Sequence, residues 1–348
     1  MKTGVDASRA KLDRRRLESI VAAFPRVRLL VLGDVVLDEY LWGDVERVSP
    51  EAPVPIVHVR RESRALGGAG NVVRNVVALG ATCRFCAVVG DDTAGDRIVD
   101  LLKELGVDAV GVVRDASRPT TRKTRVEARS QQLLRYDRET DEVIAGATAR
   151  RLVAAIEAAL EGVDGVVFED YAKGVLAPSV VRQVLRSCRE RGLFVAVDPK
   201  NAVAPYRGAS LVKPNLRELE ELSGVHVRNP AELARAAAKL QRQLGGADVI
   251  VTRGGQGMSI FESGKPALDI ASAPFEVFDV QGAGDTAIAV LALARLAGGS
   301  WPEAVVIANA AAGIVVGKVG TATASPAETL AQLPRALQAA QRAGGKPS

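Results

Sequence analysis

The chain contains the stretch Phe278-Asp279-Val280-Gln281-Gly282-Ala283-Gly284-Asp285-Thr286, followed by an apolar, alanine-rich run. The small residues from Gly282 to Gly284 let backbone N–H groups approach an anion closely, and the helix predicted over 282–296 points its positive end at the same place. An acidic side chain beside a bound anion is electrostatically unfavourable unless it has a chemical role. We therefore expect Asp285 to take a proton from a hydroxyl group while the amides hold a transferring phosphoryl group.

The same stretch fits two alternatives. Glycines at a helix start often form a simple turn, and spacing alone leaves that possibility open. Gly282, Gly284 and Ala287 also match G-x-G-x-x-A, the fingerprint of dinucleotide-binding oxidoreductases. That fingerprint belongs to the first strand–turn–helix unit of its domain, with an acid ending the next strand about 20 residues later. Here it lies near the C-terminus, and Glu303 stands at a predicted helix start, so the oxidoreductase is disfavoured.

The composition fits a globular enzyme of one large domain or two ordinary ones. The 348 residues are 47% hydrophobic and 25% charged, which excludes a disordered, collagenous or disulfide-built chain. Two histidines and three cysteines leave little material for a metal cage or for histidine catalysis. Carboxylates, lysines and backbone amides are therefore the expected chemical groups.

Charge and hydropathy argue against nucleic-acid and membrane partners. The net charge of +5 comes from 46 basic and 41 acidic residues scattered along the chain, and aromatic residues make up only 4%. No apolar run approaches the roughly 20 residues of a membrane span, and the charged stretch Lys11 to Arg16 does not resemble a secretory signal. We expect a cytoplasmic protein.

A C-x-x-C pair, Cys83 and Cys86, suggests a redox centre or half a zinc site. The pair falls in a predicted strand, where residues three apart point to opposite faces. We therefore expect both to be small buried residues.

Short apolar runs alternate with longer amphipathic stretches, which predicts an α/β fold: a doubly wound, mostly parallel sheet flanked by helices. The predicted strands cover 27–33, 84–89, 165–169, 194–198, 209–213 and 249–252, and the predicted helices cover 71–79, 94–105, 148–161, 179–191, 230–244, 282–296 and 302–316.

Two segments break this rhythm. One carries Pro50, Pro53 and Pro55 before an alternating run, and the other is polar, alternating and basic. Because prolines confine strands to sheet edges or to separate small sheets, we expect a β lid from segments 40–62 and 118–137. The chain as a whole divides into a helical extension (1–25), one domain that includes the lid segments (26–338) and a frayed tail (339–348).

Three further turns follow or precede predicted elements. Asn215 and Glu218 stand on one face of a starting helix, where their oxygens could meet hydrated Mg²⁺ or phosphate-bound water, although a capping box accounts for them equally well. Thr252 to Gly257 could place a nucleotide against backbone, or form a plain hairpin turn. Gly67 to Asn71 precedes a helix. In open α/β sheets, such strand-end turns bind ligands.

Taken together, these four motifs resemble the ribokinase-like (PfkB) carbohydrate kinases over about residues 27–335. The resemblance implies an ATP-dependent phosphotransferase with an alcohol acceptor, in which Asp285 is the general base and Gly282, Ala283 and Gly284 form the anion hole. It implies ATP binding by Asn215, Leu216, Arg217, Glu218, Thr252, Gly254, Gly255, Gly257, Asn309 and Gly313. It implies substrate binding by Asp34, Asp38, Gly67, Gly68, Asn71, Arg135, Asp170 and Lys173, with Glu218 holding Mg²⁺ through water and phosphates.

Within the family, the residues 33–38, 49–55, 132–135 and 170–174 resemble the kinases of D-glycero-β-D-manno-heptose 7-phosphate, which supply ADP-heptose for the lipopolysaccharide core. The resemblance implies ATP and Mg²⁺ as cofactors, a sugar phosphate as substrate and a homodimer formed through the lid, and it leaves a monovalent cation open. A kinase for another sugar or sugar phosphate, or a non-catalytic sugar-nucleotide sensor, remains an alternative.

Three residues depart from the family pattern. Gln281 and Val73 stand where small residues are usual, and Glu169 replaces a serine. Gln281 and Glu169 could alter cation binding or substrate preference, whereas the base and the anion hole are kept. Many relatives carry a fused nucleotidyltransferase, and the length of this chain leads us to expect none here.

Overall fold

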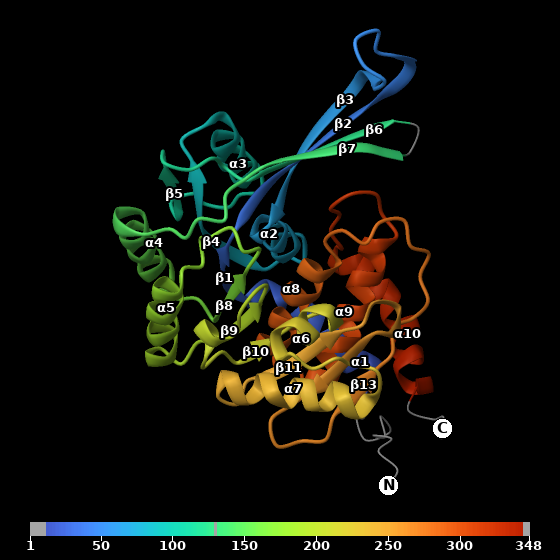
Figure 1. Ribbon diagram of the computed structural model, residues 1–348. Helices are drawn as coiled ribbons and strands as arrows, with labels where there is room; N and C mark the ends of the chain where they lie inside the picture. The colour runs from blue at the N-terminus through green and yellow to red at the C-terminus, as the bar shows by residue number, and fades with distance from the viewer. Residues whose placement is uncertain (1–11, 129–130, 344–348) are drawn as a thin grey trace.

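The computed structural model describes residues 12–128 and 131–343. The main sheet contains β1 (Arg28–Gly33), β4 (Thr82–Gly90), β5 (Val112–Asp115), β8 (Gly165–Glu169), β9 (Phe194–Asp198), β10 (Leu211–Val212), β11 (Asp248–Thr252), β12 (Met258–Phe261) and β13 (Leu268–Ile270). Its nine strands run in the order β13-β12-β11-β10-β9-β8-β1-β4-β5 (Figure 1). Within the described part of this sheet, only the pairs that involve β12 are antiparallel. The predicted mostly parallel, doubly wound sheet is confirmed.

Helices cover both faces of this sheet. One face packs against α1 (Arg14–Ala22), α2 (Ala69–Ala78), α3 (Thr93–Glu104), α8 (Ala283–Leu296), α9 (Trp301–Val316) and α10 (Pro326–Ala343). The other face packs against α4 (Gly146–Ala159), α5 (Pro178–Glu190), α6 (Leu216–Ser223) and α7 (Pro230–Leu244). Strand β1 shows the alternation that produces two cores, because Leu29 and Val31 join the first face and Leu30 and Leu32 the second.

The predicted strands 165–169 and 194–198 coincide with β8 and β9. The strand predicted over 209–213 is shorter than expected. The N–H of Ala209 donates to the carbonyl of Tyr206 in the preceding turn, so the ladder starts only at Leu211.

Cys83 and Cys86 lie on opposite faces of β4, each buried in a different hydrophobic cluster. Both are free thiols, and burial raises the pKa of Cys86 to about 12. The prediction of small buried residues is confirmed, because a thiol with so high a pKa is a poor nucleophile or metal ligand.

A separate four-stranded sheet projects from the main body (Figure 1). We call it the small sheet: it contains β2 (Val35–Val48), β3 (Pro55–Gly68), β6 (Arg122–Ala128) and β7 (Gln131–Arg138), in the order β3-β2-β6-β7. The two segments expected to form a lid contribute to these strands. The inner ends of β2 and β3 pair at Val35 and Gly68, between β1 and α2, so the root of the small sheet lies at the carboxyl end of the main sheet.

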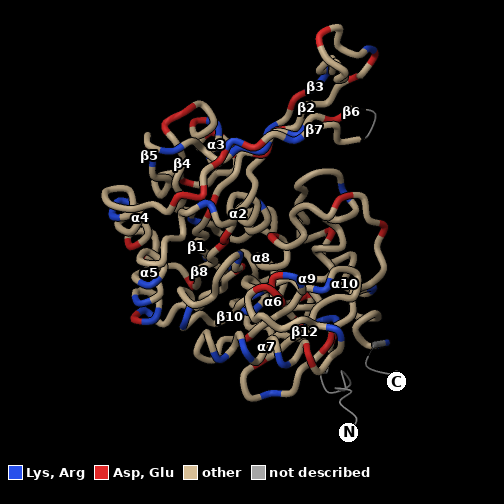
Figure 2. Tube along the Cα trace, in the orientation of Figure 1, with Lys and Arg blue, Asp and Glu red and all other residues tan. Residues whose placement is uncertain are grey.

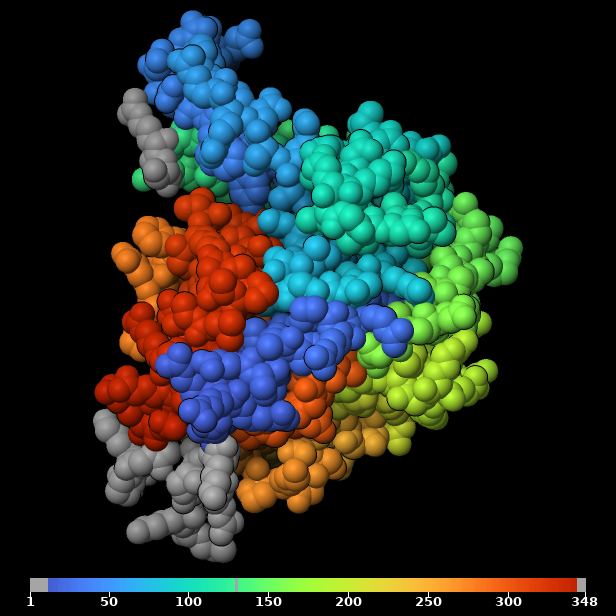
Figure 3. Space-filling model, turned by 180° about the vertical axis from the view of Figure 1, so that it is seen from behind, coloured from blue at the N-terminus to red at the C-terminus, as the bar shows by residue number. Residues whose placement is uncertain are grey.

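Both ends of the described chain pack on the same side of the molecule (Figure 3). Of the predicted helical extension, residues 12–25 are described and contain α1; residues 1–11 lie outside the described part. The predicted frayed tail overlaps α10, which continues to Ala343 because Ala336 and Ala340 are buried in the core. Within residues 12–128 and 131–343, no helix is both long and apolar enough to cross a membrane.

Helix α8 begins just after the turn at Gly282 and runs into the core, where every residue from Asp285 to Ala294 is buried. We expect Leu291→Ala to lower the free energy of unfolding by about 2–5 kcal/mol, because it removes buried methyl groups and leaves a cavity. The matched control Val110→Ala, at a side chain that is 83% exposed, should change it by less than about 0.5 kcal/mol. Urea denaturation measures both, and equal losses would contradict the buried role of α8.

Candidate active site

The site centres on the N-terminus of α8. Gly282 caps this helix with φ 77°, in the left-handed region that favours glycine. A Cβ at Gly282 would lie 2.6 Å from the Nδ2 of Asn71, whereas a Cβ at Gly284 would meet nothing closer than the Nζ of Lys213 at 3.7 Å. The space around Gly284 leaves the positive helix end accessible to an anion, while the Ala283 N–H donates to the Val280 carbonyl at 3.4 Å.

Asp285 lies in the first turn of α8 and is 5% exposed. Asn71 donates from Nδ2 to its Oδ2 at 2.7 Å, and the Tyr171 hydroxyl donates to its Oδ1 at 2.9 Å. Burial raises the pKa of Asp285, and the two hydrogen bonds oppose that rise by stabilising the charged form. The result is a fixed, weakly solvated carboxylate suited to accept a proton.

Tyr171 is a site residue that the sequence did not predict. It lies just after β8, in the stretch Asp170 to Gly174 that carried part of the family resemblance. Burial raises its pKa well above the ordinary value, so its hydroxyl stays protonated and remains a donor to Asp285. Only the fold brings these two residues together across 114 positions of sequence.

Three charged residues end neighbouring strands beneath the turn. The Nζ of Lys213, after β10, lies 2.7 Å from the Oδ2 of Asp198 at the end of β9. Burial raises the pKa of Asp198 to about 7, against the opposing charge of Lys213. Glu169 ends β8 opposite Asp198, and burial raises its pKa well above normal; its Oε2 has no hydrogen-bond partner among the described residues. Lys213 thus lies close to two buried carboxyl groups at the strand ends, those of Asp198 and Glu169.

Asn215 and Glu218 form the capping box of α6. Asn215 Oδ1 accepts from the Glu218 N–H at 2.9 Å, and Glu218 Oε2 accepts from the Asn215 N–H at 3.0 Å. The other Glu218 oxygen accepts from Lys200 at 2.9 Å. In the described ranges, no group of three or more His, Cys, Asp or Glu is arranged to hold a metal. The donor set fits a hydrated Mg²⁺ that takes most of its ligands from phosphates and water.

Two neighbouring residues of the predicted nucleotide site face elsewhere. Leu216 packs against the hydrophobic core. Arg217 pairs with Glu221 at 2.8 Å through a side chain that is 86% exposed. Neither side chain lines the cavity described next.

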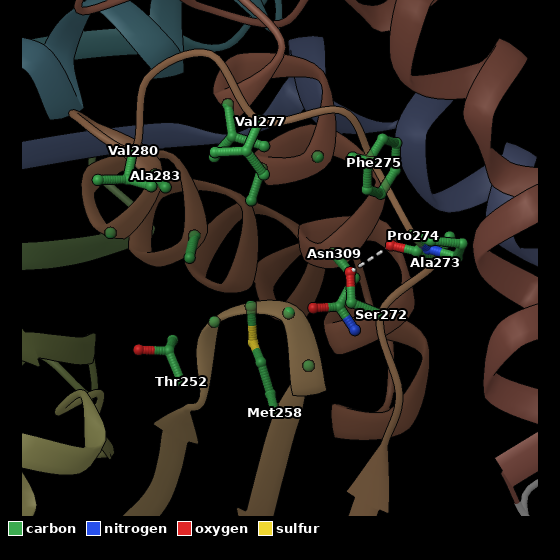
Figure 4. Close-up of a pocket in the computed structure, with 18 residues that line it drawn as sticks. Thr252, Met258, Ser272, Ala273, Pro274, Phe275, Val277, Val280, Ala283 and Asn309 are labelled. Atoms are coloured by element: carbon green, nitrogen blue, oxygen red, sulfur yellow. Dashed lines mark hydrogen bonds between the residues drawn. The ribbon is translucent and has the colours of Figure 1, made fainter.

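A cavity of about 440 Å³ opens beside the α8 turn (Figure 4). Of the predicted nucleotide-binding residues, those that line it are Thr252, Gly254, Gly255, Gly257, Asn309 and Gly313, together with Ala283 and Gly284 of the turn. Figure 4 shows Thr252 and Met258 on one wall and Phe275, Val277 and Val280 on the opposite wall. Residues 272–280 lack a periodic pattern, so the sequence did not predict the apolar wall.

The ring of Phe275 is packed directly on α9, since a Cβ at Gly313 would lie 2.1 Å from it. From the other side, the Arg335 guanidinium of α10 lies 5.2 Å from the ring centroid and donates to the carbonyl of Pro274. The apolar wall is thus held between the last two helices.

The predicted sugar-binding residues Asp38, Gly67 and Asn71 surround the same turn from the small sheet and α2. A Cβ at Gly67 would lie 2.0 Å from the Asp38 Oδ2, so only glycine fits beside this carboxylate. Asn71 contacts Asp285 directly. Arg125 of β6, from the basic segment expected to form part of the lid, donates from Nη1 to Asp38 at 2.6 Å, and its buried Nε has no partner in the described structure.

Asp34 and Asp170 are engaged by the chain itself. Asp34 accepts hydrogen bonds from the N–H groups of Tyr171, Lys173 and Val175, at 2.9, 3.0 and 3.1 Å. Asp170 accepts from the Ala172 N–H, and from the Tyr206 hydroxyl, each at 2.8 Å. Both carboxylates therefore fix the loop that presents Tyr171 to Asp285. Gly68, with φ 56°, lies against the backbone of Asp34.

The side chains of Arg135 and Lys173 take part in a separate ionic network. Arg135 lies on the exposed strand β7 and pairs with Asp137 at 3.0 Å. Lys173 pairs with Glu139 at 2.7 Å, and Lys123 bridges the two acids. Figure 2 shows basic and acidic residues mixed along this part of the small sheet. The structure thus places these two predicted substrate-binding residues among acidic partners of the chain.

Comparison with known families and proteins gives a consistent result. The pfkB family of carbohydrate kinases matches residues 28–328. A bifunctional protein HldE from Desulfatibacillum aliphaticivorans is 44% identical over 314 residues, covering 90% of this chain and 64% of that protein. One from Citrifermentans bemidjiense is 45% identical over 323 residues, covering 92% and 66%. The chain thus spans a little under two thirds of the length of these relatives.

Solved structures share the fold. Arabidopsis thaliana ribokinase, complexed with ribose and ATP, aligns with a TM-score of 0.69 at 21% identity, over 88% of this chain and 98% of its own. Escherichia coli phosphofructokinase-2, in complex with potassium, aligns with a TM-score of 0.73 at 21% identity, over 89% and 100%. The ribokinase-like fold is confirmed.

Burial of Asp285 predicts a pH-dependent effect on stability. A carboxyl group whose pKa is higher in the folded state contributes less to stability as the pH rises from its unfolded to its folded pKa. We expect Asp285→Asn to gain stability relative to the parent chain as the pH rises above about 4, the ordinary pKa of an aspartate. Denaturant unfolding at several pH values measures the difference.

Asp164→Asn provides a control of opposite sign. The hydrogen bond from Arg28 lowers the pKa of Asp164, so this carboxylate stabilises the fold above its unfolded pKa and loses that contribution on acidification. The stability of the parent chain relative to Asp164→Asn should therefore increase as the pH rises. If the stability of Asp285→Asn relative to the parent chain stays constant or decreases as the pH rises, the pKa of Asp285 is not raised by burial.

Proposed function

Because the chain belongs to the pfkB family of carbohydrate kinases, we propose that it transfers the γ-phosphate of ATP to the anomeric hydroxyl of D-glycero-β-D-manno-heptose 7-phosphate. The product would be heptose 1,7-bisphosphate, an intermediate on the way to ADP-heptose and the lipopolysaccharide core. The observation that carries the proposal is the buried carboxylate of Asp285, held by Asn71 and Tyr171 at the positive end of α8.

Asp285 would accept the proton of the attacking hydroxyl. Its two hydrogen bonds fix the carboxylate in one orientation, and burial raises its pKa, which favours proton transfer to it. The N–H groups of the Gly282 to Gly284 turn would stabilise charge on the transferred phosphoryl group. Phosphoryl transfer needs positioning and electrostatics more than covalent chemistry, and this arrangement supplies both.

The nucleotide would occupy the cavity beside this turn. Its apolar wall, with Phe275 and Val277, suits a purine base, while the glycine-rich edge from Gly254 to Gly257 allows close backbone approach. Lys213 lies near the cavity end at Gly284 and would face the phosphates. A Mg²⁺ ion bound to those phosphates would neutralise their charge, with Glu218 contacting its water shell.

The choice of sugar rests on the resemblance to heptose 7-phosphate kinases and on the 41–45% identity to proteins named bifunctional protein HldE. The most discriminating stretch, 49–55, forms the turn between β2 and β3 and includes Pro55, the first residue of β3. Arg125 beside Asp38 gives the sugar side a buried cation that a phosphorylated acceptor could approach. A kinase for another sugar phosphate is the second candidate, and a non-catalytic sensor would lack a use for the positioned Asp285.

A homodimer through the small sheet is part of the proposal. Every residue of the outer strand β7 is exposed, including Leu134 at 55% and Tyr136 at 45%, and Val59 of β3 is 44% exposed. Exposed apolar edge strands favour pairing with another chain. An enzyme that consumes ATP and a sugar phosphate is expected in the cytoplasm.

We expect Asp285→Asn to reduce turnover at least 10²-fold, the lower range for losing a general base, while the Kd for ATP changes less than about tenfold. Coupled ADP-release assays and calorimetry measure the two quantities. Asp44→Asn, on the exposed outer part of β2, is the control and should retain activity. Unchanged turnover in Asp285→Asn would show that Asp285 is not the general base.

The sugar is identified by the same assay over heptose, hexose and pentose phosphates and their unphosphorylated forms. Heptose 7-phosphate should give the highest kcat/KM. If fructose 6-phosphate or ribose exceeds it by a large factor, the heptose assignment fails and the family stands.

The dimer predicts that light scattering gives twice the chain mass, and that Leu134→Asp shifts the protein to the monomer, because it buries a charge in the contact. Val110→Asp, on an exposed site outside the small sheet, should leave the mass unchanged. A parent chain that is monomeric at micromolar concentration would exclude this assembly.

A further inference from the structure

One hydrogen bond joins the small sheet to the anion-binding turn. The hydroxyl of Tyr40, on β2, donates to the Oε1 of Gln281 at 3.2 Å. The two residues are 241 positions apart in sequence, so the contact exists only where the fold brings β2 against the turn before α8. Gln281 is also the position where the family pattern has a small residue, which would be too short for this contact.

The Tyr40 side of the contact is held firmly. The Tyr40 ring is 5% exposed and stacks on Trp42 with centroids 5.4 Å apart and planes 8° apart. The Arg61 guanidinium covers Trp42 at 3.8 Å, and that of Arg125 lies 5.2 Å from the Tyr40 ring. Because Arg125 also pairs with Asp38, the stack is continuous with the proposed sugar side. Burial raises the pKa of Tyr40, so the phenol remains a hydrogen-bond donor.

The Gln281 side is braced as well. The Gln281 N–H donates to Asp279 Oδ1 at 2.9 Å, and Asp279 Oδ2 accepts from the Gly320 N–H at 3.2 Å. Gln281 directly precedes Gly282, the cap of α8. A displacement of Gln281 therefore moves the first amides of the anion-binding turn.

We infer that Tyr40 and Gln281 are positioning residues that lock the small sheet onto the anion-binding turn, so that the acceptor hydroxyl and the phosphoryl group are held by one rigid unit. Asp38 lies two residues before Tyr40 on β2 and would position the acceptor sugar in this unit. Gly282 lies next to Gln281 and would position the phosphoryl group. The inference rests on the proposed kinase function, and it concerns how the two halves of that site are aligned.

Tyr40→Phe tests the inference, because it removes only the hydroxyl and keeps the ring stack. With the best acceptor from the sugar panel, kcat should fall roughly three- to tenfold, the size expected for one hydrogen bond, while the KM for ATP stays within about twofold. Gln281→Ser should lower kcat by a similar factor, and the kcat of the double variant should be no lower than that of either single variant. Asp44→Asn, which breaks an exposed ion pair further out on β2, is the matched control and should keep the parent kcat.

A second measurement does not depend on turnover. Amide hydrogen exchange at residues 279–284 should become faster in Tyr40→Phe and Gln281→Ser by a similar factor, without a change in exchange of the α9 core. A parent kcat in Tyr40→Phe, additive losses in the double variant, or unchanged exchange at 279–284 would each overturn the inference. If the parent chain phosphorylates no sugar, the proposed function fails on its own, and the exchange measurement still decides the contact.

Discussion

A single carboxylate in the first turn of a buried helix constrains most of this structure. Asp285 is almost inaccessible to water, and burial raises its pKa, so the chain must supply polar partners to keep its ionised form. Those partners come from separate places: Asn71 from α2 and Tyr171 from the loop after β8. Asp34 then fixes that loop through three backbone N–H groups. Residues outside the α8 turn thus fix the orientation of the Asp285 carboxylate.

The same constraint explains why two sheets meet at this point. The carboxyl ends of β8, β9 and β10 bring Glu169, Asp198 and Lys213 beneath the turn, and β2 and β6 bring Asp38 and Arg125 to its other side. An open parallel sheet alone offers one edge. The small sheet provides the second set of side chains, which include Asp38 and Arg125.

The sequence predicted what local chemistry determines. Strands β8 and β9, helix α7 and the glycine turns at Gly254 to Gly257 depend on short-range pattern, and the structure has them where they were expected. Tyr171 and the Asp198–Lys213 pair depend on contacts far apart in sequence, so no local pattern marks them. Arg125 lies in the basic segment that the sequence singled out, but its pairing with Asp38 depends on the fold. Helical geometry places two further predicted residues elsewhere: Leu216 and Arg217 follow Asn215 directly, and their side chains lie against the core and in solvent.

The apolar wall of the cavity also has a thermodynamic consequence. Phe275 is held between Gly313 of α9 and Arg335 of α10, so the order of the last helix and the shape of the cavity are properties of one packed unit. Coupling between two such features is reciprocal. If a molecule binds in the cavity against Phe275 and stabilises the packing of α10, then the packing of α10 increases the affinity for that molecule by the same free energy. The packing of α10 and the filling of the cavity would therefore be linked through Phe275, at a distance from the α8 turn.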